Sequence, residues 1–340
     1  MVWLFPSEYL RLVALGISKH KWNKLTDAKY ENHLLKFQRN EVDRRLLSIR
    51  PPSELYRVPD IISKKSSWKG SDWLYWLLFY EIPCLEGVIN KDILEYFLRL
   101  NNCMFALLGD KIEVNEFENI QDDIIKFCKD FEKIFGMDFC TSNVHALLHL
   151  CASVRKCGPL WATSAFAPES KIGKIKESVK GTNKVADQIA DRNAEYYEQR
   201  NRLLSRVTKI DTIAAMFCNN LLSKTEKPTF NYQESDEKAL VYTDYVKESG
   251  KYTRCSFNNT IYHSIDYKRA KTTDNTIIML QDGRIGQIKY FYLEENKANL
   301  CINEFSVHPF QIDDIVWKNI FYVLDIKENV KISISKVKKN

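Results

Sequence analysis

The sequence predicts an α+β protein in which a mainly helical block is followed by a small C-terminal β-barrel or β-sandwich. From residue 70 to 157 apolar residues recur at spacings of three and four, which is typical of amphipathic helices. From Cys255 onward the period changes to two, in short β-branched and aromatic runs that are typical of strands. We therefore expect a helical region over 1–222, a linker over 223–254 and an all-β module over 255–337.

The N-terminal 17 residues are expected to form a strand or a short buried helix. They are apolar, but they have no basic leader and are interrupted by Pro6, Glu8 and Arg11, so they do not match a signal peptide. Residues 49–62 contain three prolines and are expected to be extended.

Helices are predicted over 70–83, 90–108, 115–136, 141–157 and 183–222. In the third, one face contains Phe117, Ile120, Ile124, Phe127 and Phe131. Residues 73–89 approach the length of a membrane span, but Glu81 and Pro83 interrupt them, so we expect a core helix and no membrane partner.

The C-terminal part is expected to contain five or six strands, with Asp282-Gly283 as a hairpin turn. The preceding residues 224–252 are polar and rich in turn-forming residues, which favours a linker. Tyr290, Phe291 and Tyr292 either line a ligand groove or serve as core residues and cross-strand pairs.

Composition limits the functional classes only loosely. The 50 basic and 44 acidic residues give a net charge of +6, which is compatible with nucleic acid but common in other proteins. Nine cysteines without a C-x-x-C pair indicate a reducing compartment, so we expect a nuclear or otherwise intracellular protein that is not secreted. No motif for a small-molecule substrate is evident.

A basic helix is predicted between Pro168, which suits a first helical turn, and Gly181, a typical C-terminal stop. Ile172, Ile175 and Val179 mark its apolar face. Five lysines lie on this helix or just after it: Lys171, Lys174, Lys176, Lys180 and Lys184. They either face solvent or contact a DNA backbone. The same alternatives apply to Arg192, Arg200, Arg202 and Arg206 further on.

Glu169 lies in the first turn of this helix, where the helix dipole favours a negative charge. A carboxylate held at such a position after a rigid turn is also suited to bind a divalent metal.

Four short motifs occur in order around this glutamate: HALLHL, GPLW, SAF followed three residues later by Glu-Ser, and KGT. Together they resemble the C-terminal part of CACTA-type (En/Spm-like) DNA transposases, over roughly residues 3 to 210. The resemblance implies that the helical block is the remnant of a ribonuclease-H-like core with a helical insertion. It also implies that Glu169 is the last member of an Asp-Asp-Glu triad that binds magnesium.

The rest of that metal site departs from the family pattern. Where the family has an Asp-x-x-His motif, this chain has Glu8 and Arg11. Glu8 is a weak candidate for a metal ligand, and the alternative is an ordinary pair with Arg11 on a helix surface. The two triad aspartates would lie before residue 1. We therefore expect magnesium only if upstream residues complete the site.

His145 and His149 are one helical turn apart. Their apolar neighbours favour buried, hydrogen-bonded histidines over zinc ligands, and position 146 is Ala, so the H-E-x-x-H pattern is absent. If the resemblance holds, these histidines lie behind the acidic residues of the metal site and hold them in position.

The sequence thus indicates a transposon-derived polypeptide, catalytically incomplete by itself, that contacts the DNA phosphate backbone and is open to self-association. Two alternatives remain. One is a domesticated, non-catalytic nuclear protein that binds DNA or chromatin, and the other is a structural or interaction protein without a nucleic-acid role.

Overall fold

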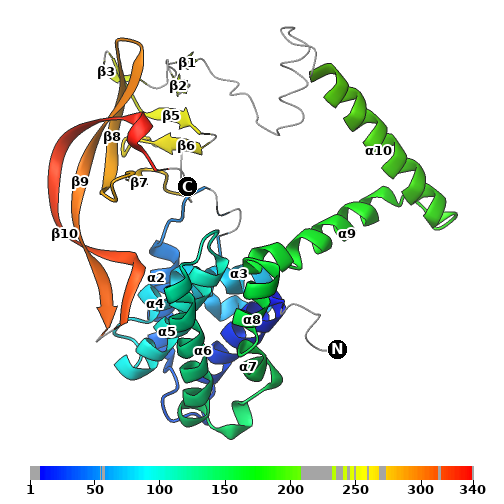
Figure 1. Cartoon of the computed structure of the whole chain (residues 1–340). Helices are drawn as coiled ribbons and strands as arrows, with labels where there is room; N and C mark the ends of the chain where they lie inside the picture. Colours follow the sequence, from blue (N-terminus) through cyan, green and yellow to red (C-terminus); the bar gives the residue numbers. More distant parts are fainter. Residues whose placement is uncertain are drawn as a thin grey trace. The chain divides into compact units, whose positions relative to one another are not determined.

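The computed structural model describes residues 8–53, 55, 58–207, 232–234, 240–242, 246–248, 250–258, 260–267, 273–312 and 315–338 (Figure 1). Its contacts divide into two compact units. The first contains the described residues of Met1–Ala165, Ala270–Asp274 and Ser306–Ile326. The second contains those of Phe166–Arg269, Asn275–Phe305 and Lys327–Asn340.

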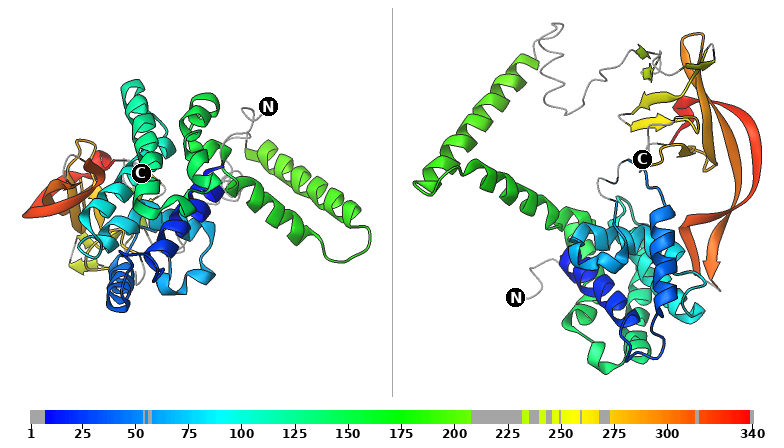
Figure 2. Two further views of the ribbon diagram at one scale, coloured as in Figure 1. Left: turned by 90° about the horizontal axis from the view of Figure 1, so that it is seen from below. Right: turned by 180° about the vertical axis from the view of Figure 1, so that it is seen from behind.

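The first unit is built from helices, seen from two further sides in Figure 2. Its N-terminal half contains η2 (Leu10–Ser18), α1 (Lys19–Leu25), α2 (Lys36–Ser48), η3 (Ile62–Ser67), α3 (Gly70–Tyr75), η4 (Trp76–Tyr80) and α4 (Glu81–Leu85). Next come α5 (Lys91–Leu108), α6 (Val114–Phe135), η5 (Met137–Phe139), α7 (Ser142–Leu147), α8 (Leu150–Cys157) and η6 (Leu160–Thr163). The N-terminal segment is thus a buried helix, and η2 and η4 are π-helical.

The core of this unit is aromatic. Trp73, Trp76 and Tyr80 are completely buried, so the apolar stretch 73–89 is a core element as predicted. The predicted face of α6 is also confirmed: Phe127 and Phe131 are completely buried, and the ring of Phe127 stacks on Tyr96 of α5 with the centroids 4.2 Å apart. No helix in the described part of the chain has the length and hydropathy of a membrane span.

A buried ion pair lies in this core. Lys21 Nζ of α1 is 2.7 Å from Glu81 Oε2 of α4, and the two side chains are 0% and 2% exposed. The ammonium group also lies 4.0 Å from the centre of the Phe97 ring. Burial lowers the pKa of Lys21 and raises that of Glu81, against their mutual attraction. Glu81, which interrupts the apolar stretch 73–89, therefore balances the charge of Lys21 in the core.

The second unit contains two helices and the β part. The helices are α9 (Phe166–Ser178) and α10 (Val185–Val207), which contact each other. The short strands are β1 (Tyr232–Glu234), β2 (Leu240–Tyr242), β3 (Val246–Glu248), β4 (Lys251–Tyr252), β5 (Arg254–Phe257), β6 (Thr260–His263) and β7 (Ile277–Met279). The long strands are β8 (Ile285–Glu294), β9 (Lys297–Ile312) and β10 (Ile315–Ser333), of which β9 and β10 run on into the first unit.

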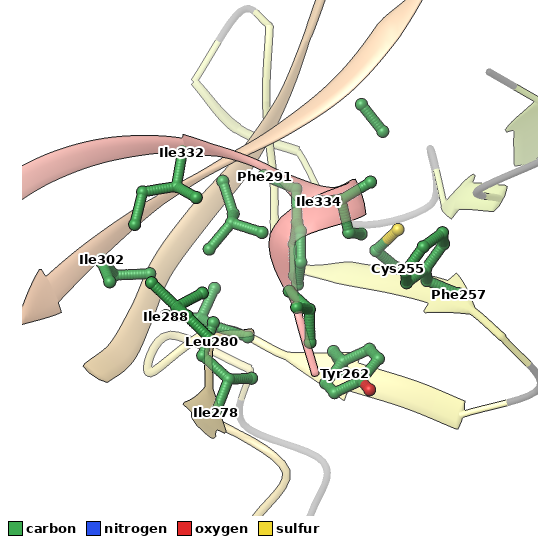
Figure 3. Packing of buried hydrophobic residues seen from close by; sticks show 13 residues of the cluster. Cys255, Phe257, Tyr262, Ile278, Leu280, Ile288, Phe291, Ile302, Ile332 and Ile334 are labelled. Atoms are coloured by element: carbon green, nitrogen blue, oxygen red, sulfur yellow. The ribbon is translucent and has the colours of Figure 1, made fainter. Parts of the chain in front are cut away.

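These strands form two antiparallel sheets, in the orders β1-β2-β5-β6 and β10-β9-β8-β4-β3, with β7 pairing with β8. A single apolar core joins them: Cys255 and Phe257 of β5 cluster with Phe291 of β8 and Ile302 of β9 (Figure 3). Strand β7 pairs with β8 across the predicted Asp282-Gly283 turn, where Gly283 has a φ of 88°. The α+β class is therefore confirmed, but the sheets are open and do not close into a barrel.

Two further expectations differ from what is observed. Strands β1 to β4 lie within residues 223–254, the segment predicted as a linker. The ribonuclease-H-like core implied by the resemblance requires a sheet, but the described residues between 8 and 207 contain helices and no strand. The predicted helix 183–222 is seen as α10, and residues 208–222 lie outside the described part of the chain.

Candidate metal-binding and DNA-binding residues

Glu8 is half-buried, and its carboxylate caps the start of the first helix. Its Oε1 accepts hydrogen bonds from the backbone N–H groups of Leu10 (3.0 Å) and Ala165 (3.1 Å). Its Oε2 accepts one from the N–H of Arg11 at 2.8 Å. These N–H groups at the start of η2 have no carbonyl partner within the helix, and the carboxylate supplies one. The contact with Arg11 thus involves the backbone of that residue.

The bond to Ala165 belongs to a larger contact between distant motifs. Tyr9, next to Glu8, is buried and hydrogen-bonds to the side chain of Ser164. Gly16 of η2 approaches Asn143 so closely that a Cβ at this position would lie 2.6 Å from Asn143 Nδ2. The N-terminal helix therefore packs against both the start of the HALLHL helix and the SAF motif.

Glu169 lies in the first turn of α9, as predicted, and is exposed. The helix starts at Phe166, two residues before Pro168, and ends at Ser178 rather than at Gly181. Glu8 belongs to the first unit and Glu169 to the second. Among the residues that the structure describes, no three His, Cys, Asp or Glu side chains are grouped so that they could hold a metal ion.

The basic segment 169–184 contains five lysines and two glutamates, Glu169 and Glu177. Four of the predicted contact residues are exposed: Lys171, Lys176, Lys180 and Lys184. Lys174 lies on the same helix, but its side chain is outside the described part of the structure. The predicted apolar face of α9 is not buried, since Ile172 is 52% exposed and Ile175 and Val179 are only partly covered.

The following helix differs in charge pattern. On α10 four acidic residues balance four arginines, and Arg202 forms an ion pair with Glu198 four residues earlier at 2.6 Å. The side chains of Arg200 and Arg206 lie outside the described part. The excess of positive charge is thus concentrated in α9 and the turn that follows it.

The histidine prediction was wrong in part. His145 is exposed and His149 is half-buried, so they are not a buried pair. Their ring centroids are 5.4 Å apart in an edge-to-face arrangement. The predicted helix 141–157 is divided into α7 and α8, and His149 is the residue that immediately precedes α8. This break could not be predicted from the sequence, because the apolar spacing continues through it.

A cavity of about 300 Å³ beside His145 is lined by Cys128, Cys140, Val144 and Leu148, among others. Cys128 is held there by a hydrogen bond from its Sγ to the carbonyl oxygen of Val144, with 3.3 Å between the two atoms. Burial raises the pKa of this thiol to about 12, so the thiol is protonated at neutral pH and is a poor metal ligand or nucleophile. The arrangement is therefore structural.

The three consecutive aromatic residues of β8 do not share one face. Phe291 is buried in the core shared by the two sheets. Tyr290 and Tyr292 lie on the opposite face, because side chains alternate along a strand. There Lys251 Nζ lies 5.0 Å from the centre of the Tyr290 ring and Lys331 Nζ 5.7 Å from that of Tyr292. Phe291 is thus a core residue, and Tyr290 and Tyr292 are surface residues whose rings contact lysines.

The chain was compared with protein families, curated proteins and solved structures. A protein-family model described as a domain of unknown function (DUF4218) matches residues 107–219. This segment runs from the end of α5 through α10 and includes both histidines, Glu169 and the basic segment 169–184, but neither Glu8 nor the strands. No curated protein and no solved structure shows significant similarity to the chain.

Proposed function

We propose that this chain is a transposon-derived, intracellular protein that resembles the C-terminal part of a CACTA-type transposase and binds the DNA phosphate backbone. The family match and the transposase-like motifs fall on the same stretch, and the matched domain is commonly found in transposase-associated plant proteins. Such a protein would act in the nucleus.

The basic segment 169–184 is the observation that favours DNA as the partner. Exposed lysines on α9 and the following turn can approach phosphates, and Lys171 and Lys176 have no acidic residue three or four positions away along the chain. Each lysine that neutralises a phosphate releases condensed counterions from the DNA, so binding of this kind depends steeply on salt. It carries little sequence information by itself.

We further propose that the chain does not cleave DNA alone. Glu169 is exposed and suited to hold magnesium together with other carboxylates, whereas the carboxylate of Glu8 is already occupied by backbone N–H groups. Two divalent metals of a strand-transfer site need several carboxylates. If coding sequence upstream of residue 1 supplies them, Glu169→Gln in the extended protein should abolish magnesium-dependent cleavage.

The test of DNA binding uses the full chain and a fluorescent duplex of random sequence, titrated between about 50 and about 200 mM salt. The variant replaces four exposed lysines with glutamine: Lys171, Lys176, Lys180 and Lys184. We expect its affinity at low salt to fall at least about tenfold. The slope of log affinity against log salt should flatten by about 0.9 for each lysine that contacts a phosphate.

A matched control replaces four exposed lysines of the first unit with glutamine: Lys111, Lys126, Lys129 and Lys133. Since the net charge changes equally, a general electrostatic effect would weaken both variants to the same degree. Equal weakening, or no binding by the natural chain at low salt, would refute the proposal. The second result would favour a structural or interaction protein, which the ion pairing along α10 also fits.

A further inference from the structure

Strand β10 ends the larger sheet. In the order β10-β9-β8-β4-β3 it pairs with β9 on one side, and no described strand pairs with its other side. Figures 1 and 2 show it at the outer border of the sheet next to β9. With 19 residues it is the longest strand described. An edge of this kind presents a row of backbone N–H and C=O groups to a further strand. The N–H of Ile326 donates a hydrogen bond to Oδ1 of the neighbouring Asp325 at 2.8 Å, a local contact that a partner strand would replace.

The middle of this strand is unusually apolar for an edge. Every residue from Tyr322 to Asn329 is exposed, on both faces of the strand. Within that stretch Val323 is 52%, Leu324 67% and Ile326 49% exposed. Proteins normally protect such edges with short strands, prolines, bulges or charged side chains. Here the exposed charged residues Asp325, Lys327 and Glu328 stand among the apolar ones, so a partner strand must bring opposite charges to them.

We propose that residues 323–329 of β10 pair antiparallel with the same residues of a second copy of this chain, centred on Ile326. In an antiparallel pair about a twofold axis, residues at equal distances from the centre face each other. This register places Asp325 of each copy opposite Lys327 of the other. The edge is therefore complementary to itself in charge, with two symmetry-related ion pairs flanking an apolar contact between the two Ile326 side chains.

Neighbouring registers lack this match. A centre at Asp325 places two like charges opposite each other. A centre at Leu324 places Asp325 opposite Val323 and leaves both charges without a partner. Asn329, with a φ of 60°, interrupts the extended backbone and sets the C-terminal limit of the pairing segment.

The strand is also held in place before any partner arrives. Within the first unit, Asn102 Nδ2 donates a hydrogen bond to the carbonyl oxygen of Val316 at 3.0 Å. The hydroxyl of Tyr322 donates one to Glu86 Oε1 at 2.5 Å, and the Tyr322 ring packs on Phe310. A fixed edge loses less conformational entropy on pairing than a mobile one. This interface is independent of the basic segment 169–184 and of DNA.

The test is sedimentation velocity of the full chain from about 1 to about 100 µM, since dimer formation depends on concentration. We expect a monomer–dimer equilibrium. Asp325→Lys alone and Lys327→Asp alone should each weaken dimerisation at least about fivefold, because two cross-strand pairs change from attraction to repulsion. The double variant Asp325→Lys/Lys327→Asp should restore it. An equimolar mixture of the two single variants should also form dimers, because the charges then match between chains.

The matched control is Lys336→Asp, which makes the same charge change at an exposed residue outside the strand and should leave dimerisation unchanged. Leu324→Lys tests the apolar edge itself and should weaken dimerisation. Since all these side chains are exposed, each variant should retain the far-ultraviolet circular dichroism of the natural chain. A chain that stays monomeric throughout, or dimers that tolerate both single charge reversals, would overturn the proposal.

Discussion

The buried pair of Lys21 and Glu81 gives the sharpest test of how the first unit is stabilised. Replacing Lys21 with Met keeps an unbranched side chain that is one heavy atom shorter, but leaves the Glu81 carboxylate in a core where it is 2% exposed. Removing one partner of such a pair costs about 3–5 kcal/mol, because the remaining charge is desolvated without compensation. For a unit of this size the melting temperature should fall by roughly 6–20 °C.

The double variant Lys21→Met/Glu81→Leu removes both charges and should be far less destabilised than the sum of the single changes, because no charge remains in the core. Thermal melting followed by circular dichroism at 222 nm reports mainly on the helices. Additive losses in the two single variants, or a loss below about 1 kcal/mol for Lys21→Met, would contradict the assignment of a tightly coupled buried pair.

The pH dependence gives a second readout of the same pair. Burial raises the pKa of Glu81 in the folded state above its unfolded value, and removing Lys21 raises it further. The folded state then binds more protons than the unfolded state, so stability falls as the pH rises through that window. Lys21→Met should therefore be less destabilising near pH 4.5 than at pH 7.

Three further changes in the first unit have defined outcomes in the same melting assay. Burial and the nearby Lys24 lower the pKa of His20 in the folded state. The unfolded state therefore binds a proton more readily, and the protein loses stability as the pH falls below about 6.5. His20→Phe should remove this sensitivity to acid. Asn101 is completely buried and donates hydrogen bonds to two carbonyls of η4. Asn101→Leu should therefore lower the free energy of unfolding by about 1–3 kcal/mol. An unchanged melting temperature would show that these bonds contribute nothing. Glu8→Ala should cost about 1–2 kcal/mol as a lost helix cap, whereas Glu8→Gln, which keeps an acceptor oxygen, should cost less; the reverse order would argue against capping.

Local periodicity was sufficient to predict the long elements. Helices α5 and α6 were predicted to within one residue at each end. An apolar repeat of 3.6 residues puts its side chains on one face only if the backbone is an α-helix. The strands from Cys255 onward and the turn at Gly283 were equally clear, since alternation and Asp-Gly are both local signals.

The errors arose where the outcome depends on distant contacts. Nothing near Glu8 in the sequence indicates that Ala165 would donate a hydrogen bond to it. The repeat of α9 indicated an apolar face, but an apolar face is buried only where it has a packing partner, and Ile172 is 52% exposed. The buried histidines were inferred from apolar neighbours, but the break between α7 and α8 leaves His145 exposed. Strands β1 to β4 were not predicted because each is only two or three residues long and they lie in a segment rich in polar and turn-forming residues.

The contact between Glu8 and Ala165 also bears on how such a region can be inherited. The recognisable segment begins at residue 107, but its helices complete their core with residues far upstream: Phe127 stacks on Tyr96, and Asn143 packs against Gly16. A genetic rearrangement that transferred only residues 107–219 would carry helices without the partners that cover them. A chain that inherited only residues 107–219 would therefore expose the surfaces of α6 and α7 that Tyr96 and Gly16 cover in this unit.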